Sequence, residues 1–431
     1  MTTTRYAALG ETLVQETMDN GLRVNIVPRP AFHETFAQLA VDYGSVDTHY
    51  RDITGAAASD PAGIAHFLEH KLFEKEDHDA FDLFGATGAD ANAFTSTNRT
   101  AYLFSTPRAV KENLATLLDF VQSPYFSAKT VAKEKGIIGQ EIQMYQDDPG
   151  WLLYNGLLNQ LYPGEPIAQD VTGTLASIAD ITPELLYRAY DTFYQPSNCT
   201  LTVVGPVDPA EILALVAENQ AAKPQFAQEL PQRLDDFQVA PVAPAHTVHA
   251  AVVRPKWVLG VRGQTPLAND LAGTRFQIAT QLLLEMLFGD SGAWFQQAYD
   301  QGLLDDSFDY DYSVQRPANY LTIGGDTSDP AGLAQAVQAV IAAGADQAQL
   351  TPERFARIKQ AAIGKYAMGL NAVESVASQI SAQSFSPVNW FDYGQLLQDT
   401  TLAAVQAAAA RWFDPAACTT LTVLPEEAAH A

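Results

Sequence analysis

Cysteine and positive charge are both scarce in this chain of 431 residues. Its two cysteines, Cys199 and Cys418, form no C-x-x-C pair and lie in Thr/Leu/Val-rich segments, which favours buried thiols over a disulfide or a nucleophile. With 25 Lys and Arg against 50 Asp and Glu, the formal net charge is −25. That balance argues against nucleic acids and anionic membranes as partners, because both are bound through basic surface.

Long apolar runs are also missing. No segment is long and apolar enough to span a bilayer, and residues 1–6 lack the apolar core of a signal peptide, so we expect a cytoplasmic protein. The chain shows no P-loop, dinucleotide fingerprint or nucleophile elbow. Its composition, 47% hydrophobic and 17% charged, is that of a globular protein, and its length predicts two or more domains.

One short motif carries chemistry. His66, Glu69 and His70 form the pattern H-x-x-E-H. Because each residue of an α-helix turns by about 100°, these three side chains share one helix face. Two imidazoles four residues apart can bind one metal ion, and the carboxylate beside them can take a proton from metal-bound water. The order is reversed relative to H-E-x-x-H, which is the inverzincin pattern.

A catalytic zinc site usually has three protein ligands, so a third must come from another segment. The helical stretch 127–146 offers Glu134 and Glu141, which are seven residues apart and therefore share a face. One could bind the metal while the other orients a ligand. From spacing alone, a solvated acidic face is the favoured interpretation.

The chain also contains a faint internal duplication. Residues 193–204 and 412–423 each read as a helix end, a proline break and a strand. We therefore predict a zinc-bearing domain over 1–220, a Pro/Ala/Gln-rich linker over 221–245 and a homologous domain without a metal site over 246–431.

The expected elements give the fold class. We predict a hairpin over 12–28 around an Asn-Gly turn, strands over 36–46 and 91–105, and helices over 108–122 and 127–146. Because strands mostly neighbour each other, with helices between the groups, the chain should be α+β, each domain an antiparallel-rich sheet flanked by helices.

These motifs resemble the pitrilysin/insulysin family of zinc metallopeptidases, which are inverzincins. The resemblance rests on the H-x-x-E-H run and on the E-x6-E pattern whose second glutamate is Glu141. It also rests on Gly63 before the H-x-x-E-H motif and on the segment Asn92-Ala93-Phe94-Thr95 after it. The residues 134–149 look closest to the YmfH-like bacterial branch. The duplication also fits, so the resemblance covers nearly the whole chain.

The resemblance implies a zinc-dependent metalloendopeptidase that hydrolyses extended peptides by a Glu-activated, zinc-bound water. It makes Zn²⁺ the cofactor, Glu69 the general base and Glu134 the acid that supports the ligands. The implied metal ligands are His66, His70 and Glu141. It further implies that an edge strand with Asn92, Ala93, Phe94 and Thr95 binds the substrate backbone.

One departure from the family pattern concerns the second half. Family members usually carry an Arg and a Tyr there that orient the substrate, whereas this chain has Tyr299 and Asp306 or Asp305. A zinc-less paralogous partner could supply the missing pair in a heterodimer, or the chain could act alone or as a homodimer. Two alternatives stay open: a non-catalytic scaffold subunit of a larger complex, and a maturation peptidase dedicated to one peptide precursor.

Overall fold

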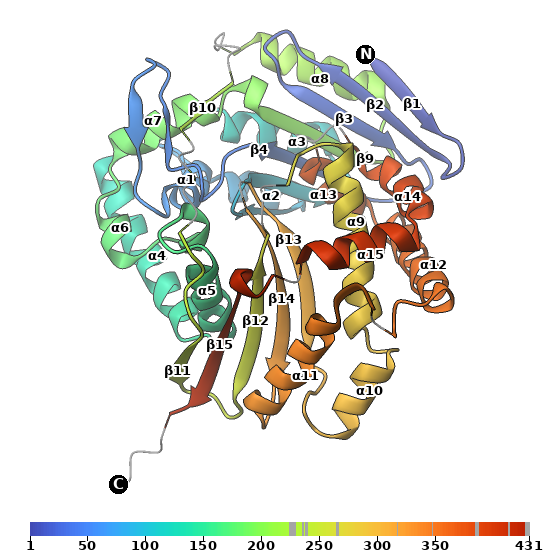
Figure 1. Cartoon of the computed structure of the whole chain (residues 1–431). Helices are drawn as coiled ribbons and strands as arrows, with labels where there is room; N and C mark the ends of the chain where they lie inside the picture. Colours follow the sequence, from blue (N-terminus) through green and yellow to red (C-terminus); the bar gives the residue numbers. More distant parts are fainter. Residues whose placement is uncertain are drawn as a thin grey trace. The chain divides into compact units, whose positions relative to one another are not determined.

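The computed structural model describes residues 1–223, 230–234, 237, 240–263, 267–316, 318–346, 348–383, 388–412 and 414–426. The chain divides into two compact units. Unit 1 comprises Met1–Ile142, Asp170–Asp236 and Met368–Phe391, and unit 2 comprises Gln143–Gln169, Phe237–Ala367 and Asp392–Ala431. Each unit combines helices with a mostly antiparallel sheet, so the predicted α+β class is confirmed (Figure 1).

Unit 1 is built on a seven-stranded sheet. In spatial order its strands are β1 (Thr2–Tyr6), β2 (Glu11–Thr17), β3 (Arg23–Pro28), β9 (Cys199–Gly205), β4 (Thr35–Val41), β8 (Thr100–Thr106) and β7 (Asp90–Thr95). Only β3 and β9 pair in parallel. A small sheet of β10 (Gln232–Arg233), β5 (His49–Arg51) and β6 (Ala57–Ser59) accompanies it.

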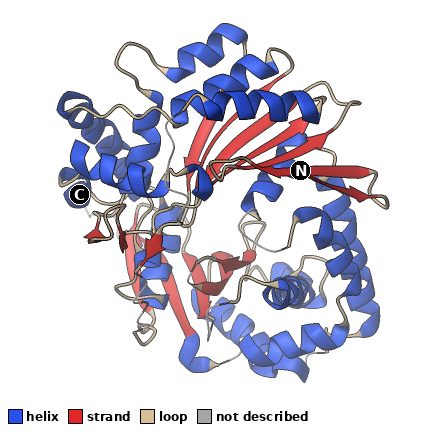
Figure 2. Ribbon diagram, turned by 90° about the horizontal axis from the view of Figure 1, so that it is seen from above, coloured by secondary structure: helices blue, strands red, loops and turns tan. Residues whose placement is uncertain are grey.

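Helices cover both faces of this sheet (Figure 2). Alternation along a strand sends successive side chains to opposite faces, so Val203 joins the core under α1 and α3, whereas Val204 joins the core under α13. The helices of unit 1 are α1 (Ile64–Phe73), α2 (Ala80–Thr87), α3 (Val110–Val121), most of α4 (Ala128–Gln146), α6 (Leu175–Ala179), α7 (Pro183–Phe193), α8 (Pro209–Ala221) and α13 (Val373–Ala382).

Unit 2 repeats the plan with five strands. In spatial order they are β11 (His246–Ala250), β15 (Cys418–Pro425), β12 (Lys256–Arg262), β14 (Asn319–Asp326) and β13 (Asp309–Val314). The helices are α5 (Pro149–Leu161), α9 (Leu271–Phe288), α10 (Ala293–Asp300), α11 (Pro330–Ala343), α12 (Pro352–Gly369), α14 (Trp390–Asp399) and α15 (Leu402–Trp412). Four 3₁₀ turns complete the described structure: Pro166–Ala168, Pro196–Asn198, Gly344–Asp346 and Pro415–Ala417.

Each compact unit contains one helix that comes from the other half of the sequence. Helix α5, from the first half, packs on β15 and β12 of unit 2, and α13, from the second half, packs on β9 and β4 of unit 1. The sequence boundaries at 220 and 245 stay a proposal about the two duplicated copies. Parts of the proposed linker, residues 224–229, 235–236 and 238–239, lie outside the described residues.

The element predictions can be compared one by one. The hairpin is confirmed as β2 and β3, and the two helices as α3 and α4. The single strand predicted over 91–105 is wrong, because residues 96–99 turn the chain and produce the antiparallel pair β7 and β8. No helix in the described ranges has both the length and the apolar character needed to cross a membrane.

Candidate metal centre

The H-x-x-E-H motif lies on α1, a short helix that is almost entirely buried. The helix begins after Gly63, whose φ of 91° lies in the left-handed region. A side chain at that position would also collide with the carbonyl oxygen of Thr172, 2.4 Å from an ideal Cβ. Glycine therefore sets the entry of the helix, and the buried apolar residues around the motif fix its rotation against the core.

Helix α4 brings the two predicted glutamates to the same place. Its buried residues include Val131, Glu134, Ile138 and Ile142, a spacing of three or four that turns one face toward α1. Glu134 is buried, and Glu141, one residue before Ile142, is half-buried. Two helices that are remote in sequence thus supply one site.

Three potential ligands meet there. Nε2 of His66 lies 3.7 Å from Oε1 of Glu141, and Nε2 of His70 lies 3.7 Å from Oε2 of Glu141. One donor atom from each residue lies within 4.8 Å of the others. In the described part of the chain no other group of His, Cys, Asp or Glu side chains gathers in this way. Zinc–ligand bonds of about 2.0–2.2 Å would draw such atoms only slightly closer, so two imidazoles and a carboxylate fit this metal.

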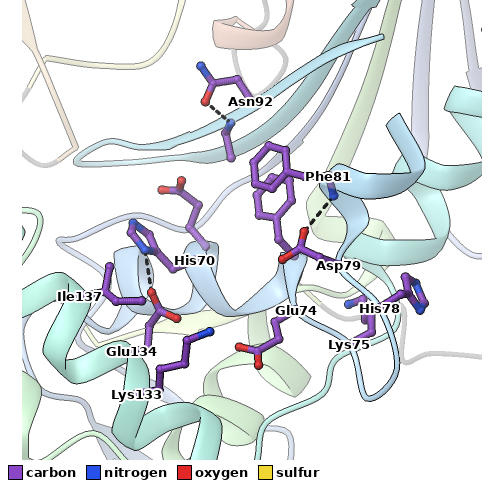
Figure 3. Close-up of a pocket in the computed structure, with 13 residues that line it drawn as sticks. His70, Glu74, Lys75, His78, Asp79, Phe81, Asn92, Lys133, Glu134 and Ile137 are labelled. Atoms are coloured by element: carbon purple, nitrogen blue, oxygen red, sulfur yellow. Dashed lines mark hydrogen bonds and ion pairs between the residues drawn. The ribbon is translucent and has the colours of Figure 1, made fainter. Parts of the chain in front are cut away.

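Glu134 contacts His70 and is not one of the three potential ligands. Its Oε1 lies 3.1 Å from Nδ1 of His70, on the opposite side of the ring from Nε2 (Figure 3). A carboxylate at Nδ1 holds the proton on that nitrogen and leaves the Nε2 lone pair for a metal. Nδ1 of His66 is buried and has no such partner among the described residues.

The electrostatics of the site favour a cation. Burial, together with the neighbouring His70, lowers the pKa of His66 to about 3, so this imidazole is neutral as a metal ligand must be. Burial also pushes the pKa of His70 down, but the hydrogen bond to Glu134 and the charges of Glu69, Glu134 and Glu141 outweigh it and raise that pKa. The carboxylates thus stabilise positive charge at the point where the three donors meet.

Glu69 is placed next to the ligands but is held by another element. Its Oε2 accepts a hydrogen bond of 2.6 Å from Oγ1 of Thr95, at the end of β7. Burial raises the pKa of Glu69 and Glu141 adds to the rise, while the hydrogen bond from Thr95 lowers it. A carboxylate whose pKa is set by such opposing effects can accept a proton and release it again.

Strand β7 ends the seven-stranded sheet of unit 1. Among the described residues it pairs on one side only, with β8. Asn92 is exposed on this edge, and its Oδ1 accepts a hydrogen bond of 2.8 Å from the amide of Ala93 (Figure 3). Phe94 stacks under the guanidinium of Arg99 at 5.2 Å. The four residues predicted to bind substrate therefore lie on an available strand edge.

A cavity of about 620 Å³ opens beside Glu69 and His70. Asn92 and Ala93 of β7 border it, and Phe73 and Phe81 stack within its wall with ring centroids 4.1 Å apart. Figure 3 shows Phe81 in this wall. The cavity is large enough to accommodate one amino-acid side chain of a peptide.

Unit 2 holds different polar side chains. Glu285, on α9, accepts a hydrogen bond of 2.8 Å from the hydroxyl of Tyr310. Tyr299 is exposed on α10 and, with Asp306, lines a cavity of about 640 Å³. Asp305 forms an ion pair with Arg254. None of these side chains reproduces an Arg and Tyr pair.

Two contacts escaped the sequence analysis. The hydroxyl of Thr95 reaches Glu69, although only main-chain pairing was expected of this residue. Lys71, directly after the motif, is fully buried beside Glu134. The sequence did not indicate that Lys71 is buried, because a lysine on a helix normally faces solvent.

The fold and the H-x-x-E-H helix together define an inverzincin-type protein. Family models agree: "Insulinase (Peptidase family M16)" matches residues 54–175, and "Peptidase M16 inactive domain" matches residues 180–362. The uncharacterized zinc protease YmfH of Bacillus subtilis is 41% identical over 403 residues, which cover 93% of this chain and 94% of YmfH. The chain belongs to peptidase family M16, in its YmfH-like branch, and the resemblance seen in the sequence is confirmed.

Solved structures support the same conclusion. The crystal structure of an M16-like peptidase from Alicyclobacillus acidocaldarius is 34% identical, with a TM-score of 0.92 over 96% of this chain and 99% of that one. The periplasmic protease PqqL from Escherichia coli is 20% identical, with a TM-score of 0.74, and this chain covers 47% of it. The PqqL match shows a shared fold only.

Proposed function

We propose that this chain is a zinc-dependent metalloendopeptidase that cleaves extended peptides. The observation that carries the proposal is the meeting of His66, His70 and Glu141 beside the buried carboxylate of Glu69. Relatives named as zinc proteases support the class of activity. In this proposal the three meeting side chains are the metal ligands, and Glu134 supports His70.

In this proposal the ligands, Glu69 and Thr95 have different roles in hydrolysis. A zinc ion held by the three ligands would supply Lewis acidity, which lowers the pKa of water and polarises a carbonyl group. Glu69 removes the proton from the attacking water and returns it to the leaving amine. Thr95 keeps the carboxylate of Glu69 turned toward the site during both transfers.

The edge of β7 binds the substrate in this proposal. An extended peptide adds to a free strand edge through main-chain hydrogen bonds, which depend little on the sequence of the peptide. Ala93, Phe94 and Thr95 provide the main-chain groups, and Asn92 provides an exposed amide. Selectivity then comes from side-chain pockets such as the cavity beside Phe73 and Phe81.

We further propose that a zinc-less paralogous chain completes the enzyme. Tyr299 and Asp306 stand where the family usually has its Arg and Tyr, so this chain lacks the pair that orients the substrate. PqqL, of which this chain covers about half, is long enough to hold two such architectures in one polypeptide. Mixing this chain with its paralogue should raise peptidase activity at least tenfold, whereas full activity of the chain alone would contradict the pairing and favour a homodimer or monomer.

Glu69→Gln tests the activity itself. The variant should retain one zinc per chain but lose cleavage of fluorogenic peptides by about 10²–10⁴-fold, the usual contribution of a general base. Chelation should silence the wild type, and zinc should restore it. Glu76→Gln, an exposed glutamate after α1, is the matched control and should leave turnover unchanged.

Two results would contradict the proposal. The first is a Glu69→Gln variant that cleaves at nearly the wild-type rate. The second is a zinc-loaded protein that cleaves no peptide of a broad library, either alone or mixed with its paralogue. That result would favour a scaffold subunit or a peptidase dedicated to one precursor.

A further inference from the structure

Lys71 is a buried lysine next to the candidate metal centre. Its side chain has no exposed surface. Nζ contacts the carboxylate of Glu74, one turn further along the chain, and lies 3.8 Å from Oε2 of Glu134. It is the one lysine or arginine in the described residues that forms an ion pair with Glu134.

Burial of this ammonium group opposes folding. Lysine is almost never fully buried unless it is paired, because its charge loses hydration. An apolar side chain of similar length would fill the same buried space without that cost. The pair with half-buried Glu74 could form as well at the surface, so it does not explain why the charge lies inside.

The contact with Glu134 points to a role at the metal centre. The two oxygens of this carboxylate face different partners: Oε1 lies 3.1 Å from Nδ1 of His70, and Oε2 faces Lys71. A cation on the second oxygen favours one rotation of the carboxylate. Glu134 can then hold the proton on Nδ1 of His70 and direct its Nε2 lone pair toward the other donors.

We propose that Lys71 is a positioning residue that tunes zinc affinity through Glu134 and His70. The chain of contacts runs from Lys71 to Glu134 to His70, and none of its steps requires Lys71 to touch substrate. The inference rests on the proposed zinc site and adds a residue to which that proposal gave no role. Lys71 also offsets part of the negative charge of Glu74 and Glu134.

The test measures zinc affinity by competition with a chromophoric chelator. Lys71→Met should bind zinc about 10–100-fold more weakly than the wild type, the range typical of residues that orient a ligand. Glu74→Gln should change affinity by less than about threefold, because Lys71 can then turn fully to Glu134. Lys129→Met, an exposed lysine on α4, is the control and should bind like the wild type.

A second measurement separates positioning from folding. The melting temperature of the metal-free protein reports the structural contribution of Lys71 independently of zinc. If Lys71→Met is too unstable, Lys71→Met combined with Glu74→Gln removes both charges of the close pair and carries the same zinc test. Weak zinc binding by a folded variant supports the inference.

The outcomes distinguish this inference from the proposal beneath it. If the wild type binds zinc and folded Lys71→Met binds it equally tightly, only the role of Lys71 is overturned. If Lys71→Met loses only thermal stability, its role is structural and the inference is again wrong. If the wild type binds no zinc, the proposed function falls together with this inference.

Discussion

Among single residues, Thr95 controls the side chain on which the proposed chemistry depends. Its hydroxyl donates to Glu69 and lies 3.5 Å from the hydroxyl of Thr100. The hydrogen bond stabilises the charged form of Glu69 and so lowers its pKa, against the rise caused by burial. A residue expected only to pair with substrate thus also orients the proposed general base and lowers its pKa.

Thr95→Val should reveal this contact in a pH profile. Without the hydrogen bond, the pKa of Glu69 rises further, so the base ionises at higher pH and the acid limb of kcat/KM moves upward. Turnover should also fall about 10–100-fold, since hydrogen bonds to charged groups contribute about 1.5–3 kcal/mol. Thr95→Ser retains the hydroxyl and should keep the wild-type limb. A profile that does not move would exclude this role.

The sequence predicts some of these residues far better than others. His66, Glu69 and His70 follow from a local spacing, because helix geometry alone places them on one face. Spacing alone favoured a surface position for Glu141, and the family resemblance reversed that in favour of a ligand. The structure brings Glu141 to the two histidines. Lys71 and the hydroxyl of Thr95 depend on contacts between remote elements, which no local pattern records.

At the scale of elements, α13 shows what local patterns miss. Nothing in its own sequence says which sheet it covers. It packs on β4 and β9 of unit 1, and Ser381 accepts a buried hydrogen bond of 3.0 Å from Gln38. The strand error over 91–105 has a similar cause, since residues 96–99 contain no glycine or proline to mark the turn.

Val376 provides a test of this packing. It is completely buried between α13 and the strands of unit 1, so Val376→Ala should lower the free energy of unfolding of that unit by about 1–3 kcal/mol. Denaturant melts followed by far-UV circular dichroism would measure the change. Gln379→Ala, exposed on the same helix, should have little effect. Equal stabilities of the two variants would contradict the assignment of α13 to this core.

At the scale of the whole molecule, the two units differ in the polar side chains that they gather. Each has a mostly antiparallel sheet, but among the described residues only the first brings two histidines and a glutamate together as potential ligands. In the second unit, Glu285 accepts a hydrogen bond from Tyr310 instead. Among the described residues, the geometry that could hold a metal is therefore confined to the first unit.

The net charge of −25 gives the last prediction at this scale. A strongly negative molecule attracts cationic substrates over distances comparable with the Debye length, which falls from about 20 Å to about 6 Å as salt rises from about 20 to 300 mM. For a peptide rich in Lys or Arg, kcat/KM should therefore fall severalfold over this range. A neutral peptide of equal length and identical cleavage site is the control, and its kcat/KM should change much less. If both peptides respond alike, long-range charge does not select the substrate, and the acidic surface serves solubility alone.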